Sequence, residues 1–236
     1  FRIHELLRQY AQEKLTSTQA NLTQVLERHG QYYAQLLQEL TPALKGGAQL
    51  AATETMEADV DNLRMAWQWA VAQGRLDAIQ QSTQAWLAFC HCQSRYQEGA
   101  MLFGSAATAL TALPPTTAQQ RTLLTVLIAQ AWFLVHLRQL DDALSALTQS
   151  RALHQALGQP PLTDYLCDPA LPQGVIAYWQ GNDAAVARLG QEALQNSLLA
   201  QNPWNRQVAH YLLGRAARGL GQLAAALAQG QQALTI

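Results

Sequence analysis

The chain has 236 residues, of which 49% are hydrophobic and only 13% are charged, and its formal net charge is −1. A near-neutral chain without a run of Lys or Arg excludes the usual basic nucleic-acid surface from this segment. No uninterrupted apolar stretch is long enough to cross a bilayer, so we expect no membrane contact. Three cysteines are expected to be reduced thiols in a cytoplasmic protein.

Helical periodicity of apolar residues dominates the chain, and the alternation that is typical of strands is hard to find. Glutamine is about as frequent as Asp, Glu, Lys and Arg together, and it is a good helix former with a polar side chain. The pattern predicts roughly eleven helices, at about residues 3–15, 18–40, 57–73, 76–93, 96–113, 118–138, 141–157, 172–180, 183–200, 204–220 and 223–235.

Proline and glycine mark the predicted breaks between these helices. Pro42 and Gly46-Gly47 are expected to end the second helix, and Gly74 to end the third, because glycine commonly follows a helix C-terminus. The chain begins without Met and stops inside a helical pattern, so we expect a piece of a larger protein. We predict two parts, a helical linker at residues 1–45 and a repeat domain at residues 46–236.

One residue pattern recurs at an offset of 40 residues. Gly174-(x6)-Gly181-(x11)-Ala193-Leu194 matches Gly214-(x6)-Gly221-(x11)-Ala233-Leu234 at each of these positions. A displaced third copy has Ala131 and Ala143-Leu144, and a weaker fourth has Leu87. A small residue in the first helix of a pair would let the second helix approach closely, and the glycine at the turn would relieve its backbone. Each pair leaves an apolar face unburied, so pairs must stack.

The repeated pattern resembles the tetratricopeptide family, with a period of about 40 to 44 residues where that family usually has 34. The resemblance covers residues 76–236. It implies an all-α fold, a right-handed α-α superhelix, that is, a tetratricopeptide-like solenoid of about eleven helices. Repeat arrays of this kind present binding surfaces.

In tetratricopeptide-like stacks the first helix of each pair lines the concave surface. Aligning the pairs on Leu87, Ala131, Gly174 and Gly214 places on that surface His91, Trp132, His136, Tyr178, Trp179, Tyr211, Arg215 and Arg218. Aromatic rings beside two arginines at i, i+3 would suit a protein, an extended peptide or a small anionic inducer. Alternatively, Trp132 and Trp179 pack between neighbouring helices.

The opening residues Phe1-Arg2-Ile3-His4-Glu5-Leu6-Leu7-Arg8-Gln9-Tyr10-Ala11 resemble the junction after the winged-helix domain of STAND-class signalling ATPases. In that class, which includes bacterial transcription regulators, a Met-His-Asp motif opens such a helix. Ile3-His4-Glu5 matches the motif with Ile for Met and Glu for Asp. The resemblance implies that His4 contacts a nucleotide phosphate, whereas the alternative is an exposed histidine in a first helical turn.

A second stretch supports the same resemblance. Glu57-(x4)-Asn62-Leu63-Arg64-Met65-Ala66-Trp67 is similar to the Glu…Asn-Leu-Arg-x-Ala stretch that opens the helical arm of such regulators. The resemblance implies a winged-helix domain and an ATPase before Phe1, where ATP or ADP would bind. The segment itself contains no P-loop motif, so we expect no cofactor within it.

Other reactive side chains do not form a recognisable site. Cys90-His91-Cys92 resembles a metal-binding cluster, but Cys90 and Cys92 stand at i, i+2 of a predicted helix and diverge too far to share an ion. The carboxylates are scattered, and no arrangement indicates a nucleophile with its base. We therefore expect neither a metal site nor enzymatic activity in this segment.

Two functions fit these sequence features. The first is the sensor arm of a STAND-type transcriptional regulator, which binds an inducer or partner and controls an upstream nucleotide switch. The alternative is a constitutive tetratricopeptide adaptor that assembles protein complexes. In both cases the predicted last helix carries Leu223, Leu227 and Leu234 without a polar cap, so we expect it to fray or to associate with another copy.

Overall fold

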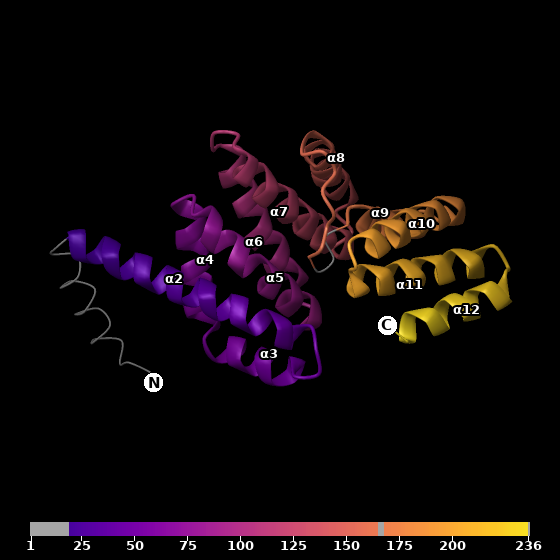
Figure 1. Ribbon diagram of the computed structural model, residues 1–236, viewed down its shortest axis with the longest axis horizontal. Coiled ribbons are helices and arrows are strands. Elements are labelled where there is room, and N and C mark those ends of the chain that lie inside the picture. The colour runs from indigo at the N-terminus through magenta and orange to yellow at the C-terminus, as the bar shows by residue number, and fades with distance from the viewer. Residues whose placement is uncertain (1–18, 165–167, 236) are drawn as a thin grey trace. The chain divides into compact units, whose positions relative to one another are not determined.

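In a computed structural model the chain is all-α over the residues that the structure describes, 19–164 and 168–235, and no strand occurs among them. Figure 1 shows the helices in chain order. They are α2 (Gln19–Leu44), α3 (Gln49–Ala58), α4 (Val60–Ala72), α5 (Leu76–Cys92), α6 (Tyr96–Thr111), α7 (Thr117–His136), α8 (Leu140–Ala156), α9 (Ala170–Trp179), α10 (Asp183–Leu199), α11 (Pro203–Gly219) and α12 (Leu223–Leu234). The helix predicted at residues 3–15, and His4 with it, lies outside the described residues.

The predicted helices agree with the structure from α5 onward, where every boundary lies within two residues of its predicted position. Two predictions before α5 are wrong. Helix α2 continues through Pro42 to Leu44, because a proline in the last turn removes only one backbone bond and its fixed φ is helical. The hydroxyl of Thr41 donates to the carbonyl of Leu37 at 2.8 Å in the same turn.

The predicted helix at residues 57–73 is in fact the end of one helix and the whole of another. Helix α3 (Gln49–Ala58) was not predicted, and Asp59 separates it from α4. Only Ala52, Thr53 and Met56 of α3 are buried, so its ten residues show too few apolar positions for a clear period. Within the STAND-like stretch, Glu57 consequently belongs to α3 and residues 62–67 belong to α4.

The chain forms two compact units, one up to Ser82 and one from Thr83 onward, with α5 passing from the first to the second. The first unit packs α2 on α3 and α4 around Leu37, Met56, Leu63 and Trp67, each 1% exposed or less. The predicted division between residues 45 and 46 stays a prediction.

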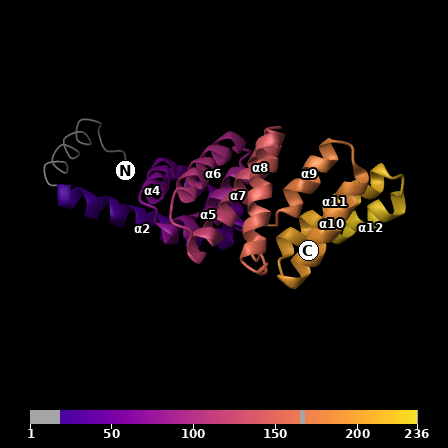
Figure 2. The same cartoon turned by 90° about the horizontal axis from the view of Figure 1, so that it is seen from above.

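In the second unit each helix from α6 to α12 packs on the next one along the chain, and further contacts join α7 to α9 and α9 to α11. Figure 2 shows α9, α10, α11 and α12 side by side. The core contains Trp86, Phe89, Phe103 and Phe133, all fully buried. The first helices of the predicted pairs are α5, α7, α9 and α11. Among them, α7 contacts α9 directly, and α9 contacts α11 directly.

The turns inside the pairs share one conformation. Gly181 and Gly221 have φ of +69° and +74°, as predicted, and the next residue donates its N–H across the turn to a carbonyl of the preceding helix. This bond is 2.9 Å from Asn182 to Ala177 and 2.8 Å from Gln222 to Ala217, which is the Schellman arrangement. Arg138 takes the same position in the α7–α8 turn with φ of +62°.

The sequence predicts that the small residue in each first helix lets the second helix of the same pair approach closely. This prediction is right for Gly214 and wrong for Gly174. A methyl group on Gly214 would contact α12, with the Ala226 carbonyl oxygen at 3.4 Å, so this glycine faces the second helix of its own pair. A methyl group on Gly174 would instead lie 2.6 Å from Cδ1 of Leu212. Gly174 therefore admits the first helix of the next pair, because α9 packs directly on α11.

Candidate functional site

A cluster of rings at the C-terminal ends of α5 and α7 contains three of the predicted surface residues. Trp132 donates its Nε1–H to Nδ1 of His91 at 3.1 Å. The ring centroid of His136 lies 5.1 Å from that of Trp132 and 5.8 Å from that of His91, and Tyr96 of α6 stacks on His136 at 4.6 Å. Trp132 is only 5% exposed, so this ring packs between helices, as the alternative interpretation predicts.

The imidazole of His91 is held neutral in this cluster. Burial, and secondly the charge of nearby His136, lower the pKa of His91 to about 4, because a low-dielectric environment disfavours the charged form. A neutral ring whose Nδ1 accepts from Trp132 carries its proton on Nε2. Protonation at Nδ1 would remove this hydrogen bond.

The cluster is linked to α9 through a residue that the sequence did not single out. The guanidinium of Arg138 lies over the ring of Trp179, with Cζ 3.5 Å from the ring centroid. Arg138 stands in the turn after α7, and its positive φ is that of the predicted turn glycines. Trp179 is 44% exposed and its ring lies 5.2 Å from that of Tyr178, so Trp179 is part of the surface.

The next contact joins α9 to α11. The guanidinium of Arg215 lies over Tyr178, with Cζ 3.9 Å from the ring centroid, and 5.7 Å from the centroid of Tyr211. Its Nε is buried without a hydrogen-bond partner among the described residues. Burial, and secondly the neighbouring Arg218, lower the pKa of the Arg215 guanidinium. No carboxylate of the described residues forms an ion pair with either arginine.

These contacts connect the predicted surface residues into one strip across the ends of α5, α7, α9 and α11. We define the aromatic–arginine strip as His91, Trp132, His136, Arg138, Tyr178, Trp179, Tyr211, Arg215 and Arg218. Its successive helices touch through His91 and Trp132, then Arg138 and Trp179, then Tyr178 and Arg215. The sequence could have indicated Arg138, because it stands in the turn that corresponds to Gly181 and Gly221.

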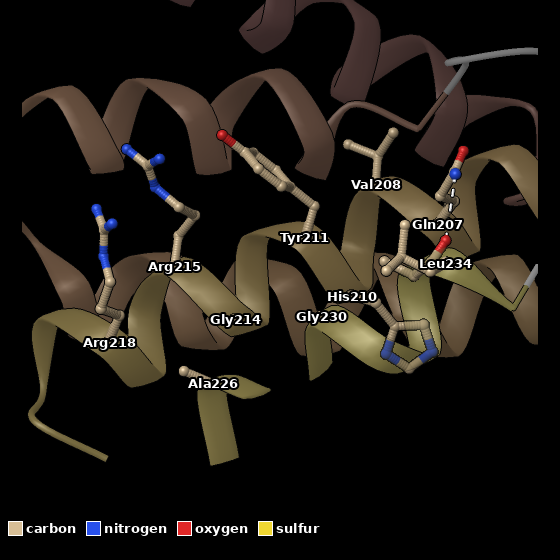
Figure 3. A pocket seen from close by; sticks show the side chains of 11 residues that line it. Gln207, Val208, His210, Tyr211, Gly214, Arg215, Arg218, Ala226, Gly230 and Leu234 are labelled. Carbon is tan, nitrogen blue, oxygen red and sulfur yellow. Dashed lines mark hydrogen bonds between the residues drawn. The ribbon is translucent and has the colours of Figure 1, made fainter. Parts of the chain in front are cut away.

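A groove of about 520 Å³ opens beside the α11 end of the strip. Its lining comes from α11 and α12 and is mostly apolar, and it includes the small residues Gly214, Ala226 and Gly230. Figure 3 shows Arg215 and Arg218 next to each other at one end and Leu234 toward the other end. The arrangement can hold an apolar body with an anionic group at the arginine end.

The remaining candidates have no built site in the described residues. Cys90 is buried and Cys92 is exposed, as their spacing on α5 predicts, and no group of three potential metal ligands occurs in the part of the chain that the structure describes. None of the described helices combines the length and the hydropathy that spanning a bilayer would require. The predicted phosphate contact, His4, lies outside the described ranges.

Comparisons of the chain with protein-family models, with curated proteins and with solved structures found no match.

Proposed function

We propose that this chain is a cytoplasmic binding arm of the tetratricopeptide-like kind, in which stacked helix pairs form a right-handed superhelix. The aromatic–arginine strip is its binding surface, and the ligand is a protein, a peptide or a small inducer that carries an anionic group. The direct contacts from α7 to α9 and from α9 to α11 support this arrangement of pairs, because stacked repeats join neighbouring first helices.

The observation that carries the proposal is the lack of polar partners around the guanidinium of Arg215 among the described residues. A partly buried guanidinium normally has hydrogen-bonded or charged partners. Among the described residues, however, Nε of Arg215 has no hydrogen-bond partner, and the guanidinium lies over the ring of Tyr178 and near that of Tyr211. Arg218 adds a second positive charge nearby. A carboxylate or phosphate of a ligand would bind both guanidinium groups through strong charge-assisted hydrogen bonds.

The STAND-like stretches extend the proposal to signalling. In the parent protein, binding at the strip would control an upstream winged-helix and nucleotide-switch region through residues 1–45, with His4 as the phosphate contact. A polypeptide that carries a P-loop before Phe1 and retains ADP would fit this sensor function. The alternative, a constitutive adaptor, is favoured by the exposed leucines of α12, which would suit permanent protein assembly.

The double change Arg215→Ala with Arg218→Ala should remove ligand binding and leave the fold intact. Arg218 is exposed and Arg215 is half-buried near the C-terminal end of α11, and neither makes an ion pair among the described residues, so helix content should not change. Binding of a captured partner should weaken by at least about 100-fold, since each of the two charge-assisted contacts contributes about 1.5–3 kcal/mol. Quantitative pull-down and circular dichroism on the same samples measure both effects.

Arg121→Ala is the matched control, because Arg121 is an exposed arginine of α7 outside the strip. It should bind like the unchanged chain. Equal loss of binding in the control and the double variant would mean that net charge alone determines binding. Unchanged binding by the double variant would show that the strip is not the binding surface.

A further inference from the structure

Arg151 of α8 shows how this chain holds a guanidinium between helices. Its Nε–H donates to Oε1 of Gln173 on α9 at 3.0 Å, and its Nη1–H donates to Oε1 of Glu192 on α10 at 2.8 Å. The side chains of Arg151 and Glu192 are 37% and 32% exposed, so the contact is half-buried. A guanidinium has five N–H donors and no acceptor, and here two further helices supply the acceptor oxygens.

The positions of this contact recur one helix pair earlier, where the arginine is replaced by alanine. The register is counted from the residues with positive φ in the turns before α6, α8 and α10, which are Ser94, Arg138 and Gly181. Each earlier position stands at the same distance from its turn residue as its counterpart in the contact. The matched pairs are Gln130 with Gln173 at eight residues before the turn residue, Gln149 with Glu192 at eleven after it, and Ala107 with Arg151 at thirteen after it.

A groove of about 430 Å³ lies at these earlier positions, and we define it as the α6–α8 groove. Its lining includes Ala107 of α6, Gln130 of α7 and Gln149 of α8, which are the counterparts of the arginine, the amide and the carboxylate. Leu127 and Leu134 of α7 also line it and are 3% and 6% exposed. Since the following pair places the long side chain of an arginine at the position of Ala107, the small alanine leaves room for a side chain from outside.

The polar groups of the groove are acceptors with one negative charge. Asp142 of α8 is exposed, lines the groove and forms no ion pair among the described residues. Gln149 donates through Nε2 to Oγ of Ser145 at 3.4 Å, which leaves its Oε1 as an acceptor. The amide of Gln130 makes no hydrogen bond within the part of the chain that the structure describes. No Lys, Arg or His among the described residues lines the groove, so the complementary ligand is a cation.

We propose that the α6–α8 groove binds an arginine side chain of a partner polypeptide. The amide oxygens of Gln130 and Gln149 accept its N–H groups, Asp142 balances its charge, and the apolar lining covers its methylene groups. An arginine within a polypeptide is favoured over the free amino acid, because a free carboxylate would meet no cation in the lining and would be repelled by Asp142. The groove shares no residue with the aromatic–arginine strip, so it adds a second ligand of opposite charge to the proposed binding arm.

Titration of the full chain with Nα-acetyl-arginine amide tests this site by NMR. The side-chain amide signals of Gln130 and Gln149 should shift and saturate, with a Kd on the order of 1 mM for so small a probe. Nα-acetyl-lysine amide has the same charge without the planar guanidinium and should bind at least about fivefold more weakly. Free arginine should also bind at least about fivefold more weakly because of its carboxylate. Amide signals that do not shift at about 20 mM probe would overturn the inference.

Variants of the protein locate the binding. Gln130→Leu should weaken binding of the arginine probe about tenfold, and the fold should persist because Leu213 stands at the corresponding position of α11, eight residues before Gly221. Asp142→Asn should weaken binding about fivefold through the loss of charge. Asp141→Asn is the matched control, since Asp141 is an exposed acid in the same first turn of α8 and does not line the groove. Equal weakening by both Asp changes would overturn the assignment to the groove.

The outcomes separate this site from the aromatic–arginine strip. The double change Arg215→Ala with Arg218→Ala should leave binding of the arginine probe unchanged, whether or not the strip binds a ligand of its own. Equal binding of the arginine and lysine probes would overturn the recognition of a guanidinium. Tighter binding of free arginine than of Nα-acetyl-arginine amide would overturn the assignment to a polypeptide.

Discussion

Gly174→Leu is expected to lower the free energy of unfolding by about 2–3 kcal/mol. Already the first side-chain carbon would lie 2.6 Å from Cδ1 of Leu212, and Leu212 is fully packed at 1% exposure. Either the Leu212 side chain must leave its packed position or α11 must move away from α9. The second change would also separate Arg215 from Tyr178. Urea denaturation followed by circular dichroism measures the loss.

Gly230→Leu is the matched control, because Gly230 is a helical glycine with open space around it. It should be neutral or stabilising by up to about 1 kcal/mol, since leucine is a better helix former than glycine. Similar destabilisation by both changes would mean that the cost arises from the loss of glycine itself. A neutral Gly174→Leu would contradict the proposed packing of α11 on α9.

Lowering the pH from 7 to 4.5 is expected to remove up to about 3 kcal/mol of stability through His91 alone. Its pKa in the folded chain is about 4 against an ordinary value near 6.5. Between these two values the unfolded chain binds the proton and the folded chain does not, so stability rises with pH across this window. Above pH 6.5 the contribution is complete, and below pH 4 no further loss comes from this group.

His91→Gln isolates the effect, because glutamine accepts a hydrogen bond from Trp132 and does not titrate. The difference in unfolding free energy between the two proteins should change by about 2–3 kcal/mol between pH 7 and pH 4.5. Carboxylates that titrate in the same range affect both proteins equally. Parallel stability curves would show that His91 is not held neutral by its contacts with Trp132 and His136.

Helix positions were predictable from α5 onward because amphipathic periodicity and turn residues agree there. Gly181 and Gly221 end their helices with positive φ, which glycine adopts without strain. The helix prediction was wrong where the rest of the structure overrode a local helix-breaking residue, and where a helix was too short to show a clear apolar period. Pro42 lies inside α2, and α3 is a ten-residue helix with few buried residues.

The sequence named most residues of the aromatic–arginine strip as candidates, but it did not give their contacts. The 40-residue offset placed Tyr178 and Arg215 on neighbouring first helices, and the structure brings them together at 3.9 Å. Arg138 was missed because its role depends on the turn after α7, where a non-glycine residue adopts positive φ. Gly190 and Gly230 share the same offset and could have been found in the sequence, but only the structure shows that Leu213 packs against Gly190.

Site-specific photocrosslinking tests the central claim most directly. Benzoylphenylalanine replaces Tyr211 on α11, which is 53% exposed, and in a second protein it replaces Met101 on α6, which is 68% exposed. If ligands bind along the aromatic–arginine strip, light should join the ligand to position 211 and not to position 101. Crosslinking at position 101 with none at position 211 would contradict a binding surface on the first helices.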